Sequence, residues 1–174
     1  MKSGKRAICA GPGNPPVLVD GTRDLDAAAR DIIHGAAYDN NLLCVGEKEV
    51  FVLDQFAGQL MAALARHGAH ALNDTQLDRL TQAAFTTKAD AGGCSRPVLN
   101  RSCVGVDAAV LARHAGANVA PNTQLLFAET DASHAFVVEE QMMPMLPIVR
   151  VKSVEEGVAA AVNAEHGYNH SAII

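Results

Sequence analysis

The sequence predicts an α/β fold in which a mostly parallel sheet carries helices on both faces. Its 174 residues suit one domain that is large enough to bury a substantial core. The composition, 49% hydrophobic but only 4% aromatic, is typical of a densely packed domain and not of a disordered chain. Short apolar runs alternate along the chain with segments of helical periodicity. Such alternation favours right-handed βαβ crossovers and therefore parallel strands.

The first part of the chain contains two strand patterns, each followed by a helix pattern. Residues 16–20 and 49–53 are apolar runs of strand length. Apolar residues then recur at helical spacing, in one segment that begins at Asp24 and in another that begins at Asp54. Both aspartates are expected to cap their helices, and Gly68 is expected to end the second one.

The rest of the chain continues this alternation around one irregular stretch. Helices are expected at residues 74–84 and 107–114. Residues 88–103 are rich in Gly, Ser, Pro and Asn and are expected to form a loop. Strands are expected at residues 124–128 and 146–151.

The C-terminal stretch contains a helix start and a final strand-like pattern. Ser153 and Glu156 form an S-x-x-E pattern, which predicts a capping box before another helix. Residues 171–174 resemble a strand that is cut short. No internal repeat, low-complexity tract or second domain is visible, so the chain is expected to form one unit.

The charge balance argues against a nucleic acid or a membrane as partner. The formal net charge is -5, and basic residues cluster only at Lys2, Lys5 and Arg6, so no basic surface for phosphate backbones is expected. No apolar stretch approaches the roughly 20 residues of a membrane helix, and the N-terminus lacks the apolar core of a secretory signal. We therefore expect a cytoplasmic protein.

Cysteine and histidine usage predicts reduced thiols and no metal site. The four cysteines, at positions 9, 44, 94 and 103, have irregular spacings and form no C-x-x-C pair. Two histidines lie three residues apart at positions 67 and 70, but no H-E-x-x-H or Cys/His cluster accompanies them. Any chemistry at a cysteine is therefore expected to use a free thiol.

The first of three notable segments is Tyr38–Lys48 (Y-D-N-N-L-L-C-V-G-E-K), a polar turn with Cys44 that leads into a strand. A cysteine between a helix and a strand can lie partly exposed at the edge of a sheet, where N–H dipoles or a cation favour the thiolate. Cys44 is thus a candidate nucleophile. On these residues alone, a buried and inert cysteine is the more common case.

The second segment is Ala10–Pro16 (A-G-P-G-N-P-P), in which small residues permit close backbone approach and prolines stiffen the turn. No Lys-Ser or Lys-Thr follows, so it is not a P-loop, and it does not fit G-x-G-x-x-G in a strand-to-helix context. Ala10 and Gly11 are candidates for contact with a cofactor, although a plain structural turn has the same residues.

The third segment is Glu139–Pro147 (E-E-Q-M-M-P-M-L-P), in which two carboxylates precede a cluster of Met and Pro. A carboxylate can accept hydrogen bonds from both hydroxyls of a ribose, and methionines pack adaptably around ligands. Solvated charges next to core methionines would also explain this segment.

Together, and in this order, the three segments resemble the aldehyde dehydrogenase superfamily. The wording G-P-G-N-P-P, D-N-N-L-L-C-V-G-E-K-E-V and E-E-Q-M-M-P-M-L-P is similar to its coenzyme A-acylating branch. The likeness is to the propionaldehyde and acetaldehyde dehydrogenases of bacterial microcompartments for propanediol and ethanolamine utilisation, and it extends across essentially the whole chain. It implies the aldehyde dehydrogenase catalytic-domain type of α/β fold.

The resemblance implies a chemistry centred on Cys44. The thiolate would add to propanal or acetaldehyde, form a thiohemiacetal, and become a thioester once hydride has left for NAD. Coenzyme A would then accept the acyl group as cosubstrate. Glu140 matches the family's nicotinamide-ribose glutamate. Hydrolytic relatives carry a general-base Glu where this sequence has Cys9 and Ala10, which fits release to a thiol.

The enzymes of this family are much longer than the chain. The resemblance implies that residues 1–174 are the cysteine-bearing catalytic domain, without the NAD-binding domain and the C-terminal segment. An asparagine that holds the oxyanion would belong to the missing part, so the isolated chain is expected to be inactive or weakly active. The resemblance also implies that the full-length enzyme is a homo-oligomer and associates with a microcompartment shell.

Two other readings of the sequence stay open. The chain is also compatible with the dehydrogenase part of a bifunctional aldehyde-alcohol dehydrogenase or a succinate semialdehyde dehydrogenase. The second reading is of another class, a noncatalytic assembly module that keeps the fold. An adjoining iron-dependent domain would favour the bifunctional enzyme, and an unreactive Cys44 would favour the module.

Overall fold

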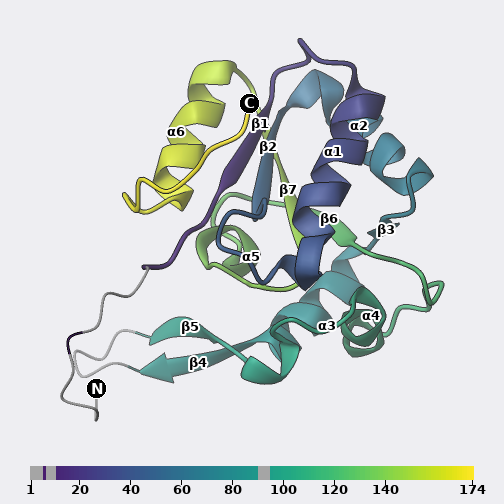
Figure 1. Cartoon of the computed structure of the whole chain (residues 1–174), viewed down its shortest axis with the longest axis vertical. Coiled ribbons are helices and arrows are strands. Elements are labelled where there is room, and N and C mark those ends of the chain that lie inside the picture. Colours follow the sequence, from purple (N-terminus) through teal and green to yellow (C-terminus); the bar gives the residue numbers. More distant parts are fainter. Residues whose placement is uncertain (1–5, 7–10, 90–94) are drawn as a thin grey trace.

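A parallel sheet forms the centre of the molecule, as Figure 1 shows for the computed structural model. The structure describes residue 6, residues 11–89 and residues 95–174. Within these residues the sheet has five strands in the order β1-β2-β7-β6-β3, and each neighbouring pair is parallel. The strands are β1 (Pro16–Val19), β2 (Glu49–Leu53), β3 (His70–Ala71), β6 (Leu126–Thr130) and β7 (Met145–Val151). The expected fold class is confirmed.

Helices pack against both faces of this sheet (Figure 1). One face packs against α1 (Leu25–Ala37) and α2 (Asp54–Arg66). The other packs against α3 (Asp74–Ala84), α4 (Ala108–Ala115), α5 (Ala135–Val138) and α6 (Val154–Ala164). In the part of the chain that the structure covers, no helix has the length and apolar character needed to span a bilayer.

The central strands are buried on both faces because their side chains alternate between two cores. Val50 and Val52 of β2 pack with α1 and α2, whereas Phe51 between them packs with Val137 of α5 and Ala164 of α6. A strand in this position needs apolar residues at successive positions. This requirement explains why the apolar run at residues 49–53 predicted the strand correctly.

The helix starts agree with the sequence, but one expected cap is wrong. The Asp24 carboxylate accepts a hydrogen bond from N of Ala27 at 2.9 Å and caps α1, as predicted. Leu53 is the residue before α2, and no side chain caps this helix. Asp54 instead lies in the first turn of α2, where its carboxylate accepts a hydrogen bond from Arg150. The competing ion pair therefore explains the missing cap.

The predicted start of α6 is correct, although the box is modified. Oγ of Ser153 accepts a hydrogen bond from N of Glu156 at 3.2 Å. The Glu156 carboxylate accepts from N of Lys152 at 2.7 Å, one residue before the position that a capping box would use. Gly68, with φ of 93°, follows the end of α2 as expected.

The loop predicted over residues 88–103 is wrong at residues 88–89, 95–99 and 101–103, and its residues 90–94 lie outside the described part of the chain. Strand β4 (Phe85–Ala89) pairs with β5 (Ser95–Leu99) in an antiparallel hairpin, and Arg101–Cys103 form a short 3-10 helix. The serine and proline of β5 break the apolar pattern by which a strand is predicted. A two-stranded hairpin tolerates this proline because both of its strands are edge strands. The strand expected at residues 124–128 begins and ends two residues later.

The last residues lie beside the first strand. Ile173 forms a parallel bridge with Val17, in which N of Leu18 donates to O of Ile173 at 2.9 Å and N of Ile173 donates to O of Pro16 at 3.0 Å. This pairing agrees with the strand-like pattern expected at the end of the chain.

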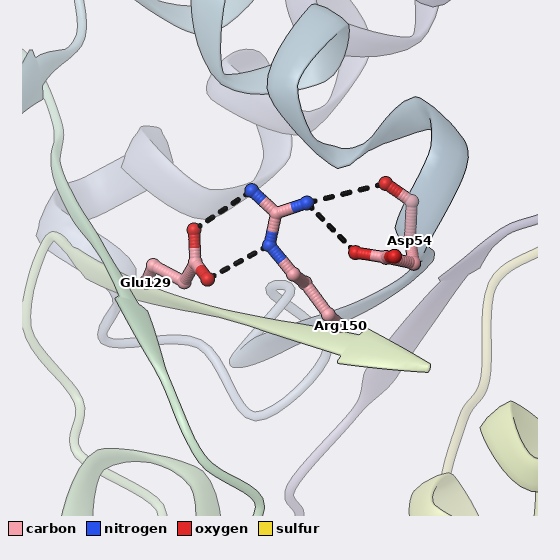
Figure 2. A network of polar contacts seen from close by, with 3 residues as sticks. All are labelled: Asp54, Glu129 and Arg150. Atoms are coloured by element: carbon pink, nitrogen blue, oxygen red, sulfur yellow. Dashed lines mark hydrogen bonds and ion pairs between the residues drawn. The ribbon is translucent and has the colours of Figure 1, made fainter. Parts of the chain in front are cut away.

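The carboxyl edge of the sheet carries a network of ion pairs, shown in Figure 2. Nε and Nη2 of Arg150 on β7 donate to the two carboxylate oxygens of Glu129 at 2.7 and 3.0 Å. Nη1 donates to O and Oδ1 of Asp54 at 3.2 and 2.9 Å. These contacts raise the pKa of Arg150 and join β7, β6 and the start of α2.

Candidate active site

The three segments singled out in the sequence meet at the amino edge of the sheet. The glycine turn precedes β1, the turn with Cys44 precedes β2, and Glu140 lies in the segment before β7. Strands β1, β2 and β7 are neighbours in the sheet and run parallel. Their amino ends therefore lie at the same edge, and the segments that lead into them come together there.

Cys44 lies in a tight turn between α1 and β2. Asp39, Asn40 and Asn41 have left-handed backbone with φ of 49°, 53° and 60°, a conformation that Asp and Asn adopt more readily than other non-glycine residues. Nδ2 of the buried Asn41 donates to O of Glu47 at 2.9 Å and closes the turn. Cys44 is partly exposed, so it is not the buried cysteine that the residues alone made the more common case.

Apolar side chains surround the cysteine in sequence. Leu42, Leu43 and Val45 are 40%, 43% and 57% exposed, which is high for large apolar residues in one short turn. A group of exposed apolar residues is typical of a surface that contacts a ligand or another protein segment. The residues next to Cys44 in the sequence therefore expose apolar surface.

Lys48 holds this turn from inside the protein. The side chain is fully buried, and its Nζ donates to O of Asn41 at 2.8 Å, to O of Leu43 at 3.2 Å and to Oδ1 of Asn41. These bonds use all three donors of the ammonium group. Burial lowers the pKa of Lys48 to about 8, although nearby acidic groups, of which Glu140 contributes most, act to raise it.

Gly13 brings the glycine turn against the Cys44 turn. A Cβ at this position would lie 2.9 Å from O of Cys44 and 3.3 Å from the ring of His170, so a larger residue would force the neighbours apart. N of Lys48 donates to O of Pro15 at 3.0 Å and joins the same two segments. The exposed His170 ring therefore belongs to this site.

Ala10 and Gly11 are the predicted cofactor contacts in the glycine turn. Gly11 is exposed, and a Cβ there would meet no atom within 4 Å. Its backbone is accessible to a ligand from the open side. Ala10 lies outside the residues that the structure describes.

Glu140 lies next to the glycine turn, as its proposed role requires. Its half-buried carboxylate accepts a hydrogen bond from the backbone N–H of Gly13. Burial raises the pKa of Glu140, while the charges of Lys48 and His170 and the Gly13 hydrogen bond lower it. The sequence-predicted Cys44 and Glu140 therefore both contact or approach Gly13.

Gln141 joins the Glu140 segment to the base of the Cys44 turn. Its side chain is fully buried, and Nε2 donates to O of Lys48 at 2.7 Å and to O of Met145 at 3.0 Å. Buried amides that satisfy backbone carbonyls fix the segments that carry them. Glu140, the preceding residue, is held at the sheet edge by this pair of bonds.

Glu49 and Asn14 introduce polar atoms into the adjacent core. Glu49 is fully buried, and neither of its carboxylate oxygens has a partner among the described residues. Burial raises its pKa to about 9, so the side chain is neutral near neutral pH. Nδ2 of Asn14 donates to O of Val137 and of Ala164 at 2.8 and 3.0 Å, whereas its Oδ1 lacks a described partner.

Cys103 and His67 make their contacts outside the three segments of the site. Cys103 is buried, with its Sγ 3.7 Å from a backbone oxygen of α3, and Cys9 and Cys94 lie outside the described residues. Nε2 of His67 pairs with Asp26 at 2.8 Å. Across residues 11–89 and 95–174, no group of three or more His, Cys, Asp or Glu side chains is arranged to hold a metal ion.

Sequence reasoning missed four members of this site. Lys48 and Gln141 stand inside the quoted motifs, but both residue types are usually exposed, so the sequence alone gave no reason to expect their burial. Gly13 was quoted, but Gly11 was preferred because spacing alone does not show which glycine faces Cys44. No pattern links His170 to the other segments, because folding alone brings it there.

These findings define the class of protein to which the chain belongs. Residues 1–174 match the aldehyde dehydrogenase family, and the chain is a member of that family. The acetaldehyde dehydrogenase (acetylating) EutE of Salmonella typhimurium is 45% identical over 168 residues, which cover 97% of this chain and 35% of EutE. The bifunctional aldehyde-alcohol dehydrogenase AdhE of Escherichia coli is 32% identical over 162 residues, 91% of this chain and 17% of AdhE. The chain thus spans about a third of EutE, or 35%.

Solved structures share the fold and the sequence. A propionaldehyde dehydrogenase of Rhodopseudomonas palustris with bound CoA and an acylated cysteine has a TM-score of 0.86 and 39% identity, over 97% of this chain and 37% of that one. One from the Clostridium phytofermentans fucose utilisation bacterial microcompartment has a TM-score of 0.84 and 44% identity, with the same coverage. An engineered glycolyl-CoA reductase with bound NADP+ has a TM-score of 0.85 and 38% identity, over 98% and 37%. These similarities confirm the resemblance seen in the three motifs.

Proposed function

We propose that residues 1–174 form the cysteine-bearing catalytic domain of a coenzyme A-acylating aldehyde dehydrogenase. The observation that carries the proposal is the partly exposed Cys44, held at the sheet edge beside Gly13 with Glu140 on the same glycine. The acetylating relative and the CoA-bound enzyme with an acylated cysteine support it. In this proposal an NAD-binding domain and a C-terminal segment complete the enzyme, in agreement with the greater length of the relatives.

Cys44 supplies the nucleophile in this proposal. The sulfur of its thiolate bonds to the aldehyde carbon as the carbonyl π bond breaks, and the oxygen takes up a proton to give a thiohemiacetal. Loss of hydride from that carbon, with return of the hydroxyl proton to solvent, re-forms the carbonyl group as a thioester on Cys44. NAD, when bound, accepts the hydride, and coenzyme A supplies the thiol that receives the acyl group. As the new thioester forms, the Cys44 S–C bond breaks and the Cys44 thiolate is regenerated.

Glu140 is the residue that we assign to the nicotinamide ribose. One hydrogen bond from Gly13 leaves further acceptor positions on the carboxylate, and half-burial leaves it accessible to ribose hydroxyls. The open space at Gly11 fits a backbone that a cofactor approaches closely, and we assign the neighbouring Ala10 to the same contact. The residues present therefore fit a dinucleotide at this edge.

Release of the acyl group to a thiol fits the residues before the glycine turn. The chain has Cys9 and Ala10 where acid-forming members of the family carry a general-base glutamate. Glu49 cannot take over this role, because its carboxyl is fully buried and its raised pKa keeps it protonated. Without a placed base, attack by water on a Cys44 thioester is disfavoured relative to attack by a thiol.

The residues around Cys44 support a short aliphatic aldehyde as substrate. Leu42, Leu43 and Val45 provide apolar contacts and no hydrogen-bonding side chain for a polar substrate tail. An apolar surface accepts both propanal and acetaldehyde, which differ by one methylene worth about 1 to 3 kcal/mol of binding. We assign both as substrates.

We also propose that the complete enzyme is a homo-oligomer in the cytoplasm, inside a bacterial microcompartment and in contact with its shell. The support is the similarity to the Clostridium phytofermentans propionaldehyde dehydrogenase from a microcompartment, with 44% identity. Copurification of the complete gene product with shell proteins, compared with a truncated form lacking its non-catalytic termini, tests this assignment.

The activity is tested on the complete gene product that contains residues 1–174. We expect propanal and acetaldehyde to yield acyl-CoA and NADH only when coenzyme A is present. Cys44→Ala should lower the rate by at least about a thousandfold, whereas Cys103→Ala should retain activity. Activity in Cys44→Ala, or free acid formed at the same rate without coenzyme A, would overturn the proposal. Residues 1–174 alone should show little NADH production.

A second candidate is the dehydrogenase part of a bifunctional aldehyde-alcohol dehydrogenase, which the identity of 32% to AdhE supports. In that case the complete gene product would also carry an iron-dependent domain and reduce the aldehyde to an alcohol. Alcohol formation that depends on added iron distinguishes the two candidates. An inactive complete protein with an unreactive Cys44 would instead favour a noncatalytic assembly module.

A further inference from the structure

Lys48 contacts all three segments that meet at the amino edge. Its Nζ bonds to backbone oxygens of Asn41 and Leu43, and Leu43 directly precedes Cys44. Its backbone N donates to O of Pro15 in the glycine turn at 3.0 Å. Its backbone O accepts from Nε2 of Gln141 in the Glu140 segment at 2.7 Å. One buried residue therefore joins the three parts of the proposed site.

A lysine at this position is costly for stability. Lys48 is 0% exposed, and transfer of an ammonium group from water into a protein core is unfavourable before its contacts are counted. Apolar residues of similar volume often stabilise a core as well as or better than buried charges. The hydrogen bonds to the Cys44 turn are the contacts that an apolar residue would not provide.

We propose that Lys48 is a positioning residue for the Cys44 nucleophile, an inference that rests on the proposed function. The buried ammonium fixes the carbonyl groups of Asn41 and Leu43 and so holds the turn that presents the Cys44 thiol. Through its backbone bonds to Pro15 and Gln141, the same residue keeps that turn in register with the glycine turn and Glu140.

Protonation controls how many of these bonds Lys48 makes. The ammonium has three donors for three acceptors, whereas the neutral amine has two and must release one of them. The titratable groups that face it are Glu140 from the segment before β7, Cys44 and Glu47 from its own turn, and Glu49 from β2. Since the pKa of Lys48 is about 8, the side chain should lose one of its three hydrogen bonds to the turn as the pH rises through that value.

The test measures Cys44 in the complete gene product with Lys48→Met, Lys48→Gln and the exposed control Lys152→Met. We expect both Lys48 variants to lower kcat by about tenfold or more, with the aldehyde KM within about threefold, because a misplaced nucleophile affects the chemical step. Alkylation of Cys44 by iodoacetamide, read by peptide mass mapping, should fall similarly near neutral pH. Lys152→Met should match the wild type.

The pH dependence separates positioning from simple packing. The ratio of wild-type to Lys48→Met alkylation rates should fall toward one as the pH rises through about 8, because the wild type then loses the ammonium that the variant lacks. A ratio within about twofold of one near neutral pH, or a large ratio that stays constant with pH, would overturn the inference.

Two controls keep this inference distinct from the proposed function. If Cys44→Ala retains activity, the proposed nucleophile is wrong, yet the alkylation ratio still measures the effect of Lys48 on the thiol. If neither Lys48 variant folds, hydrogen exchange on the wild type decides, with α2 as an internal control. Protection of residues 39–48 should rise as the pH rises through about 8, after correction for intrinsic exchange, because an opening that exposes Lys48 to water is most favoured while its buried amine is charged, and unchanged protection would refute the role.

Discussion

Gly13 and Gly11 lie two residues apart and have different surroundings. A Cβ at position 13 would lie 2.9 Å from O of Cys44, whereas a Cβ at position 11 would meet no atom within 4 Å. We expect Gly13→Ala to shift the Cys44 turn and to lower alkylation of Cys44 by about tenfold, since small misplacements of reacting groups carry large rate costs. Gly11→Ala should change the alkylation rate of Cys44 by less than about twofold. Equal rates in the two variants would contradict the contact.

Glu49 should make stability decrease as the pH rises. Its pKa rises from 4.5 to about 9 on burial, so the folded chain keeps a proton that the unfolded chain releases between these values. The stabilisation is therefore complete below the unfolded pKa and is lost as the pH rises through the folded one, by up to about 1.4 kcal/mol per pH unit. Urea denaturation of Glu49→Gln between about pH 5 and 8 should show a smaller decline than the wild type.

Glu155 provides a control for this stability measurement, and Lys48 affects stability in the opposite direction. Glu155→Gln removes an exposed carboxylate in the first turn of α6 and should leave the decline unchanged. Lys48 acts with the opposite sign, because its pKa is lowered from 10.5 to about 8, so its contribution is present above the unfolded pKa and lost as the pH falls through the folded one. An equal decline in Glu49→Gln and the wild type would show that Glu49 ionises while buried.

At the scale of elements, burial on two faces made the central strands predictable. Strand β2 packs against helices on both sides, and its apolar run at residues 49–53 gave the correct bounds. Strand β5 lies outside the main sheet, and its residues S-R-P-V-L resemble a loop because only its pairing with β4 defines it. Propensity therefore predicts the elements of the core better than those whose partners lie elsewhere in the chain.

The ion-pair network at the carboxyl edge is expected to stabilise the sheet without affecting the site. Arg150 bonds to Glu129 and Asp54, and all three side chains are at least 36% exposed, so the network should contribute about 1 to 2 kcal/mol. Arg150→Met should lower the melting temperature by a few degrees, less so at high salt. Cys44 alkylation should stay unchanged, because the network lies at the carboxyl ends of the strands, whereas Cys44 precedes the amino end of β2.

A matched variant separates the network from a single exposed pair. Arg23→Met removes only the contact with Asp31, in which both side chains are 64% exposed, and should change stability by less than about 0.5 kcal/mol. If Arg150→Met and Arg23→Met have the same effect, the network has no stabilising role beyond that of an ordinary surface ion pair.

At the scale of the whole molecule, the parallel sheet explains how the site forms. Cys44, Gly13 and Glu140 are far apart in sequence, and each precedes a strand of the same sheet. The motifs and their order were sufficient to predict the family, and two of the residues that they singled out, Cys44 and Glu140, lie at the same edge of the sheet. The contacts of Lys48 with Pro15 and Gln141 depend on strand order, which no local pattern contains. The same reason explains why His170 was not predicted.

The mass of the Cys44 peptide after reaction with aldehyde shows directly whether Cys44 is the nucleophile that carries the acyl group. The complete gene product is incubated with propanal and NAD without coenzyme A, quenched with acid and mapped by peptide mass. The account predicts a propanoyl group on Cys44 that disappears when coenzyme A is added before the quench. NADH formation with no acyl group on Cys44, or with the group on another cysteine, would contradict it.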